Sequence, residues 1–362
     1  MEPTVTPVPE GPLPFVEYGD PLGVPVVMLH GMPGTKSGPL PRGVVFRRLG
    51  VRLIAYDRPG YGQAPRRRGR TVVDAAEDVR QLADALELKR FAVLGRSGGA
   101  PHALAVAAKL GSSTVTAVAA LVSLAPYRGL CGMGEKWWEG MTSGNREIYG
   151  LEPDELDERL SELAQKSWAE PEAILEALVN SNLTRADRRV VGEETIRGQL
   201  RRTYQEAVPF GRHDGWYDDV VALRSEWGFD PRVIAVPTLL WHGELDEFSP
   251  VAHTRWLAGH LPGATMWLDS EVGHFGAMEI LPRVVRWLAD RHEGVPDGAE
   301  PFRSRAGERA AAASERVVRI EEPRHEPAVA QLADHRMVES QPGGQRSQGM
   351  VVARNPGART VG

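Results

Sequence analysis

The chain has 362 residues, which allows two domains or one large domain with an insertion. Apolar residues make up 42% and charged residues 25%, so a wholly disordered chain is excluded. The formal net charge is −5 and no basic stripe is evident, so no nucleic-acid partner is expected. No apolar run reaches the roughly 18–20 residues of a membrane span. Cys131 is the only cysteine, which excludes an internal disulfide and a cysteine-rich metal site.

Both ends of the sequence differ in composition from the middle. Residues 1–13 hold four prolines and no hydrophobic pattern, and they predict a flexible arm. They lack the basic and apolar segments of a secretory signal, so a cytoplasmic protein without membrane contact is expected. Residues 294–362 are rich in arginine, lack lysine and contain one aromatic residue, Phe302, which predicts a disordered tail. Only Ala306–Ile320 has the composition of a transient helix.

Residues 14–126 alternate between short apolar runs and helical periods. An amphipathic helix is predicted at Thr71–Leu88 and an alanine-rich helix at Ala100–Leu110. The apolar runs predict buried parallel strands at Val24–Leu29, Val51–Tyr56, Phe91–Leu94 and Ala117–Leu124. This alternation predicts an α/β fold with a mostly parallel, doubly wound sheet and right-handed crossovers.

The pattern changes over residues 127–230, where helical periods occur without a convincing strand. Strands resume afterwards, and a final helix with Pro282 in its first turn ends near Arg291. The predicted helices of the middle region are Pro153–Lys166, Pro171–Val179 and Glu193–Ala207, and the later strands are Val236–Trp241 and Ala264–Leu268. We therefore predict a core of residues 14–126 and 231–293 with an all-helical cap of residues 127–230.

The strongest local signal is Gly95-Arg96-Ser97-Gly98-Gly99, which follows a predicted strand and opens a predicted helix. This is the context of a nucleophile elbow, in which a strained turn exposes a serine hydroxyl above the sheet. Glycine is needed on both sides because a side chain would collide with the neighbouring strand or helix. A glycine-rich turn without a catalytic role is the alternative. Ser97 is the predicted nucleophile.

A second glycine-rich loop, His30-Gly31-Met32-Pro33-Gly34, directly follows a predicted strand. Such a loop can aim a backbone N–H at an oxyanion. The backbone N–H groups of Met32 and Gly98 are the predicted pair of donors. His30 precedes the serine in the chain and is predicted to hold the loop.

A serine hydroxyl needs a base, and an imidazole base needs a carboxylate that fixes its tautomer. Asp246 lies in a loop after one predicted strand, and His274 lies in a loop after the next. The chain order Ser97, Asp246, His274 is that of α/β-hydrolases. Loops after parallel strands meet at one edge of the sheet, so the three side chains are expected to lie together.

Two carboxylates compete with Asp246 for the role of the acid. Glu244 and Glu247 flank it, but the spacing from Gly243 and the later Pro250 favour Asp246 in a short turn before a helix. Three further histidines are badly spaced for one metal and are interpreted as loop and surface residues: His242, His253 and His260. Neither a metal nor a cofactor is predicted.

Taken together, these motifs resemble an α/β-hydrolase fold enzyme with a helical cap over residues 14 to 293. The H-G-M-P-G loop also resembles that of proline iminopeptidases. Those enzymes tend to have tryptophan after the serine, where this chain has Gly98, so an aminopeptidase is expected less than an esterase. Serine as the nucleophile argues against haloalkane dehalogenases and epoxide hydrolases, which use aspartate there.

The resemblance implies a serine hydrolase that cleaves an ester, thioester, lactone or amide of a small molecule, most simply a carboxylic ester. An acyltransferase or cyclase with the same triad is one alternative. A non-catalytic ligand-binding receptor on the same fold is another. The oligomeric state is left open.

Five side chains are predicted to line the substrate pocket: Met32, Arg96, Trp137, Trp138 and Phe275. The Trp137–Trp138 pair is included because neighbours on a helix point about 100° apart, so both cannot bury on one narrow stripe. One of the two is therefore expected to face the pocket above Ser97. Arg96 has two interpretations. It binds a substrate carboxylate, or it pairs with an acid outside the pocket, which is the commoner role of an arginine.

Overall fold

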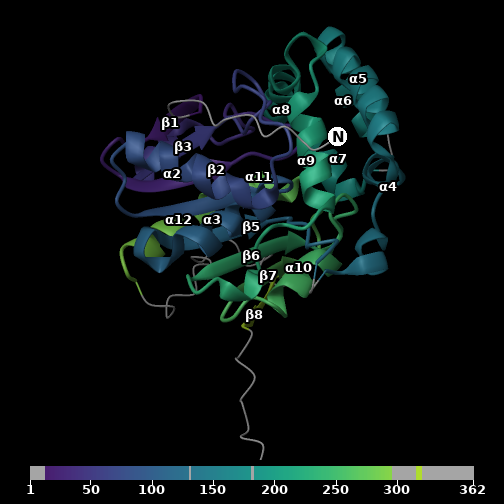
Figure 1. Ribbon diagram of the computed structural model, residues 1–362. Helices are drawn as coiled ribbons and strands as arrows, with labels where there is room; N and C mark the ends of the chain where they lie inside the picture. Colours follow the sequence, from purple (N-terminus) through teal and green to yellow (C-terminus); the bar gives the residue numbers. More distant parts are fainter. Residues whose placement is uncertain (1–12, 130–131, 181–182, 296–314, 320–362) are drawn as a thin grey trace, which may run out of the picture. The chain divides into compact units, whose positions relative to one another are not determined.

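The computed structural model describes residues 13–129, 132–180, 183–295 and 315–319. Its strands form one sheet in the order β1-β3-β2-β4-β5-β6-β7-β8 (Figure 1). The strands are β1 (Phe15–Gly19), β2 (Val24–Leu29), β3 (Val51–Tyr56), β4 (Phe91–Arg96), β5 (Val115–Leu121), β6 (Thr238–Gly243), β7 (Thr265–Asp269) and β8 (Glu315–Arg319). The six strands from β3 to β7 in this order are parallel, and the two edge strands are antiparallel. The predicted fold class is confirmed.

The two antiparallel edge strands were not predicted. β1 pairs with β3, and β8 pairs with β7. β8 lies in the segment where a transient helix was expected, so that expectation is wrong for Glu315–Arg319. Its adjacent valines favour a strand once an open sheet edge is available for pairing. The rest of the predicted tail from residue 296 and the predicted arm up to residue 12 lie outside the described residues.

Helices cover both faces of the sheet, which is why its central parallel strands are nearly continuous in apolar residues. In β2, Val27 and Leu29 pack on the face covered by α2 and α3, whereas Val26 and Met28 pack on the face covered by α1 and α12. The core helices are α1 (Gly43–Arg48), α2 (Ala75–Ala85), α3 (Gly99–Thr114), α10 (Val251–Ala258), α11 (Gly276–Glu279) and α12 (Leu281–His292). As expected, Pro282 lies in the first turn of α12.

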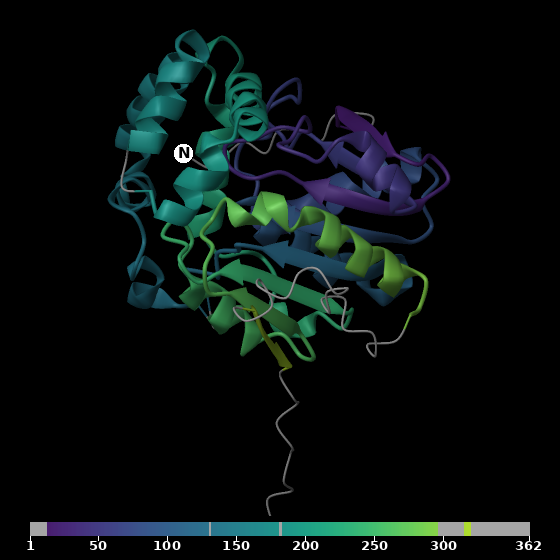
Figure 2. The same ribbon diagram turned by 180° about the vertical axis from the view of Figure 1, so that it is seen from behind.

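Between β5 and β6 the described residues form helices and loops without a strand. The α-helices there, which we call the cap helices, are α4 (Ser143–Gly150), α5 (Pro153–Ala169), α6 (Pro171–Asn180), α7 (Arg185–Gly192), α8 (Glu194–Ala207) and α9 (Asp214–Arg224). The three helices predicted in this region correspond to α5, α6 and α8. Seen from behind, the cap helices lie together on one side of the sheet (Figure 2). No helix of the described part is long and apolar enough to cross a membrane.

A buried ion cluster joins the cap helices to the core. Asp219 of α9 pairs with Arg58 and, at 2.7 Å, with Arg70, and it accepts a hydrogen bond from the Tyr61 hydroxyl at 2.9 Å. Burial alone would raise the pKa of Asp219, but the two guanidinium groups hold it below its usual range. Removing one member of such a cluster would leave an uncompensated buried charge, so the contact between α9 and the core is sensitive to any substitution in it.

Candidate active site

Ser97 lies in the tight turn between β4 and α3. Its φ of 53° places a non-glycine residue in the left-handed region, as the nucleophile-elbow interpretation predicts. A Cβ on Gly95 would lie 2.6 Å from the Ala103 side chain, and a Cβ on Gly99 would lie 2.3 Å from the His30 carbonyl oxygen. The two glycines therefore permit the close approach that exposes the serine.

The structure brings the three predicted triad residues together in the expected order. His274 Nε2 lies 3.1 Å from Ser97 Oγ, and His274 Nδ1 lies 2.7 Å from Asp246 Oδ2. They lie in the loops after β4, β6 and β7. These strands end at the same edge of the sheet, which is why distant parts of the chain meet there.

Asp246 is held in one orientation by its surroundings. Its Oδ1 accepts hydrogen bonds from the backbone N–H groups of Phe248 at 2.8 Å and Ser249 at 3.0 Å. Burial alone would raise the pKa of this carboxyl, but His274 and His242 hold it below the usual range of aspartate. The ionised form is thus retained at neutral pH.

The competing carboxylates lie elsewhere. Glu244 pairs with Arg255, and Glu247 is exposed. The interpretation of His242 and His253 as surface residues is wrong, because both are fully buried. His242 Nε2 lies 3.2 Å from Asp246 Oδ2, so it is a further neighbour of the acid that the sequence did not reveal.

Two backbone N–H groups lie next to Ser97. The Met32 nitrogen is 3.6 Å from the point where Gly98 would carry a Cβ. Neither the Met32 nor the Gly98 N–H donates a hydrogen bond to another described residue. His30 holds this loop as expected, since Arg58 N–H donates to its Nε2 at 3.1 Å and its Nδ1 lies 2.8 Å from the Gly31 carbonyl oxygen.

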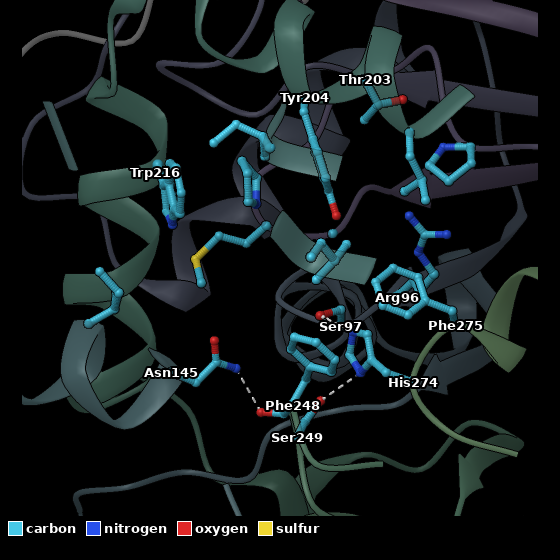
Figure 3. A pocket seen from close by; sticks show the side chains of 18 of the residues that line it. Arg96, Ser97, Asn145, Thr203, Tyr204, Trp216, Phe248, Ser249, His274 and Phe275 are labelled. Atoms are coloured by element: carbon cyan, nitrogen blue, oxygen red, sulfur yellow. Dashed lines mark hydrogen bonds between the residues drawn. The ribbon is translucent and has the colours of Figure 1, made fainter. Parts of the chain in front are cut away.

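A cavity of about 250 Å³ opens above Ser97 and His274. Its floor comes from the core: Gly31, Met32, Pro33, Pro39, Arg96, Ser97, Leu124, Phe248, Ser249, His274, Phe275 and Met278. Its roof comes from the cap helices: Asn145, Ile148, Tyr149, Ser167, Ile174, Leu178, Leu200, Thr203, Tyr204 and Trp216. Figure 3 shows Tyr204 pointing its hydroxyl from the roof toward Ser97, with Trp216 and Arg96 on opposite sides.

The profile of the alpha/beta hydrolase fold family matches residues 24–279, which is more than half of the chain. The chain belongs to this family. A Synechocystis protein that carries the name non-heme chloroperoxidase is 23% identical over 241 residues, 66% of this chain and 79% of that protein.

Many solved structures resemble this alpha/beta hydrolase. A Mycobacterium tuberculosis protein named as a non-heme bromoperoxidase superposes with a TM-score of 0.58 at 19% identity, over 78% of this chain and 96% of that one. The enol-lactonase from Burkholderia xenovorans superposes with a TM-score of 0.55 at 19% identity, over 77% and 95%. At these identities the likeness concerns the fold.

The predicted pocket residues of this alpha/beta hydrolase divide into two groups. Met32, Arg96 and Phe275 line the cavity, whereas Trp137 and Trp138 do not. Trp137 is fully buried and donates its indole N–H to the Ala125 carbonyl oxygen at 2.7 Å. Trp138 packs edge-on against Trp137, so the pair belongs to the packing beneath the cap helices, and the pocket assignment is wrong for both.

Other side chains at the site were missed from the sequence. Tyr204 and Trp216 line the roof of the cavity. Asp187 of α7 reaches across to the His274 loop, where it accepts the backbone N–H of His274 at 3.1 Å and of Phe275 at 2.7 Å. The aromatic residues were visible in the sequence, but nothing in the pattern said which of them faces the cavity. No group of three or more metal-ligating side chains occurs in the described part of the chain.

Proposed function

We propose that this protein is a serine hydrolase that cleaves a carboxylic ester or lactone of a small molecule through an acyl-enzyme. The observation that carries the proposal is the chain of contacts from Ser97 Oγ through His274 to the buried carboxylate of Asp246. A hydroxyl within hydrogen-bond reach of an imidazole, itself oriented by a carboxylate, is the arrangement that activates serine. Thioesters and amides follow the same chemistry.

In the proposed mechanism, Ser97 Oγ attacks the carbonyl carbon while His274 Nε2 takes the hydroxyl proton. Asp246 keeps the other imidazole proton on Nδ1 and stabilises the imidazolium. The tetrahedral intermediate collapses, and His274 returns the proton to the leaving alcohol. Water then attacks the acyl-enzyme with His274 again as the base, which releases the acid and restores Ser97.

The negative charge on the carbonyl oxygen needs donors that are already in place. The N–H groups of Met32 and Gly98 are suited to this role because they lie beside Ser97 and donate no hydrogen bond to another described residue. Loss of one such donor typically costs about 10²–10³ in kcat. Because these donors belong to the backbone, side-chain substitutions do not remove them directly.

The size and lining of the cavity fit a small molecule with a largely apolar skeleton. A lactone is one candidate, since an enol-lactonase is among the proteins that share this fold. An acyltransferase or cyclase would form the same acyl-enzyme but pass the acyl group to another nucleophile. A ligand-binding receptor would form no acyl-enzyme that turns over.

A fluorophosphonate probe combined with p-nitrophenyl acetate tests the proposal. We expect the wild-type protein to be labelled and to release p-nitrophenol and acetate continuously, and Ser97→Ala to do neither. Labelling without turnover of any ester in a panel of small acyl esters would contradict hydrolysis and favour a receptor. Acyl transfer to added alcohols or amines that outpaces release of acid would favour the acyltransferase.

A further inference from the structure

Arg96 stands apart from the other buried arginines of the described chain. Its side chain lines the cavity and is only 9% exposed, and its Nη1 atom is buried without a hydrogen-bond partner. Each of the other three buried arginines pairs with a carboxylate: Arg58 and Arg70 with Asp219, and Arg67 with Asp78. No described carboxylate pairs with Arg96, so the alternative of an ion pair outside the pocket is not what the structure contains.

A buried cation without a counter-charge is costly to a folded protein. Burial lowers the pKa of Arg96 to about 10, which still leaves the guanidinium charged at neutral pH. The cost is explained if the missing counter-charge arrives with a ligand. A guanidinium matches the planar geometry of a carboxylate, and such charge-assisted hydrogen bonds are among the strongest in proteins.

The guanidinium lies close to the reacting centre. Arg96 Nη2 is 3.8 Å, and the Ser97 Cβ 3.6 Å, from the same point beside Gly31, where a side chain at that glycine would begin. Tyr204 of α8 points its hydroxyl from the roof into the same region (Figure 3). Burial raises the pKa of Tyr204 to about 12, so its hydroxyl keeps its proton and remains a donor.

We propose that the substrate carries a free carboxylate, which binds to the Arg96 guanidinium and the Tyr204 hydroxyl while its ester group lies at Ser97. The proposal rests on the proposed hydrolase function and narrows its substrate class to acidic esters or lactones. The apolar remainder of the lining, including Ile148, Leu200 and Trp216, surrounds the carbon skeleton between the two polar ends.

Two pairs of esters test the proposal and distinguish the position of the carboxylate. The first pair, p-nitrophenyl hydrogen adipate and its methyl ester, differs in charge on the acyl side. The second pair, 4-carboxyphenyl acetate and its methyl ester, differs in charge on the leaving group. The readout is the ratio of kcat/KM for acid over neutral ester, after subtraction of the uncatalysed rates.

We expect Arg96→Met to lower this ratio on the order of 10- to 100-fold in at least one pair, as for loss of a hydrogen bond to a charged group. Arg96→Lys should retain part of the ratio because it keeps the charge but loses the planar geometry. Tyr204→Phe should lower it less. Arg159→Met is the matched control, since it removes an exposed positive charge of the cap helices and should leave the ratio unchanged.

Fluorophosphonate labelling separates failure of this inference from failure of the hydrolase proposal. A labelled enzyme whose acid-to-neutral ratio is the same before and after Arg96→Met in both pairs overturns the inference and leaves the hydrolase intact. If the wild type is neither labelled nor active, calorimetry on Ser97→Ala with the two adipate esters decides. Tighter binding of the acid form that is lost in Ser97→Ala/Arg96→Met supports the carboxylate site, and equal binding of both esters overturns it.

Discussion

The floor and the roof of the cavity are built in different ways. The floor consists mainly of loops that follow β2, β4, β5, β6 and β7. Its candidate catalytic atoms are fixed by backbone geometry, as the strained φ of Ser97 illustrates. The roof consists of side chains from α4, α5, α6, α8 and α9, whose directions depend on how the helices pack. We therefore expect the floor to carry out the reaction that serine hydrolases share. The side chains of the roof are expected to determine which substrate binds.

The largest effect is expected at the floor. Ser97→Ala should lower kcat for p-nitrophenyl acetate by about 10⁴-fold or more, as for other triad serines. The melting temperature should stay close to that of the wild type, because the side chain loses a single oxygen atom. Esterase activity of the purified variant near the wild-type rate would remove Ser97 from the mechanism.

The difference between floor and roof also explains which parts of the site could be predicted from the sequence. The floor could be predicted because each motif follows a strand and because glycines mark the turn around Ser97. The topology of the sheet then brings Asp246 and His274 to the same edge. The roof could not be predicted, since helical periodicity gives the buried stripe of a helix but not which neighbour it faces. Trp137 and Trp216 illustrate this, because only the second lines the cavity.

The fold shows a similar limit. The buried central strands were predicted because their apolar runs are nearly continuous, whereas β1 alternates around the exposed Glu17 and β8 has no such run. An edge strand is defined by the partner it pairs with, as β8 pairs with β7, and that partner is not encoded locally.

Trp137, which packs beneath the cap helices, and Trp216, which lines the roof, provide the next test of the difference between floor and roof. Trp137→Ala should lower the free energy of unfolding by about 3–5 kcal/mol, because it empties a fully buried site and removes the bond to Ala125. Trp216→Ala should instead raise kcat/KM for a bulky acyl ester several-fold relative to that for the acetate ester, because removal of the indole enlarges the cavity beneath the roof. Chemical denaturation and a series of p-nitrophenyl esters measure both. If Trp137→Ala shifts the ester preference as much as Trp216→Ala does, the division between packing and lining is wrong.

Between pH 8 and pH 5, sensitivity to acid should come from two buried histidines of the core helices, His102 of α3 and His253 of α10. Burial lowers the pKa of His102 and of His253 to about 3, whereas an unfolded histidine titrates near ~6.5. The unfolded chain therefore binds more protons, and stability is lost as the pH falls from about 6.5 toward 3. At pH 5 each of the two histidines should lower the free energy of unfolding by about 1–2 kcal/mol relative to pH 8.

Denaturation curves of the wild type and His253→Gln between pH 5 and 8 check this expectation. Glutamine cannot take up a proton, and its carbonyl oxygen can accept the Ala125 N–H that His253 Nδ1 now accepts. The variant should therefore lose less stability than the wild type on going from pH 8 to pH 5. Equal pH dependence of the two proteins would contradict a buried neutral histidine at this position.

A smaller effect on kcat is expected from the contact between Asp187 of the cap helix α7 and the His274 loop of the floor. Asp187→Asn keeps the shape of the side chain but replaces an acceptor with an amide group that faces the N–H groups of His274 and Phe275. The His274 loop should be held less firmly, and kcat should fall about tenfold, the equivalent of roughly 1.4 kcal/mol, while KM changes little. The exposed Asp154→Asn of α5 is the control. A rise in KM at constant kcat would place Asp187 in substrate binding instead of in the positioning of His274.

Peptide mass mapping of the wild-type protein tests the central claim most directly. The protein is treated with a fluorophosphonate and, separately, quenched with acid during turnover of a slow ester, and both samples are digested. We expect the phosphonyl group and the acyl group on the same peptide, with Ser97 as the modified residue and one group per chain. Adducts on another residue, or turnover of the ester without any acyl adduct while Ser97→Ala stays active, would contradict an acyl-enzyme at Ser97.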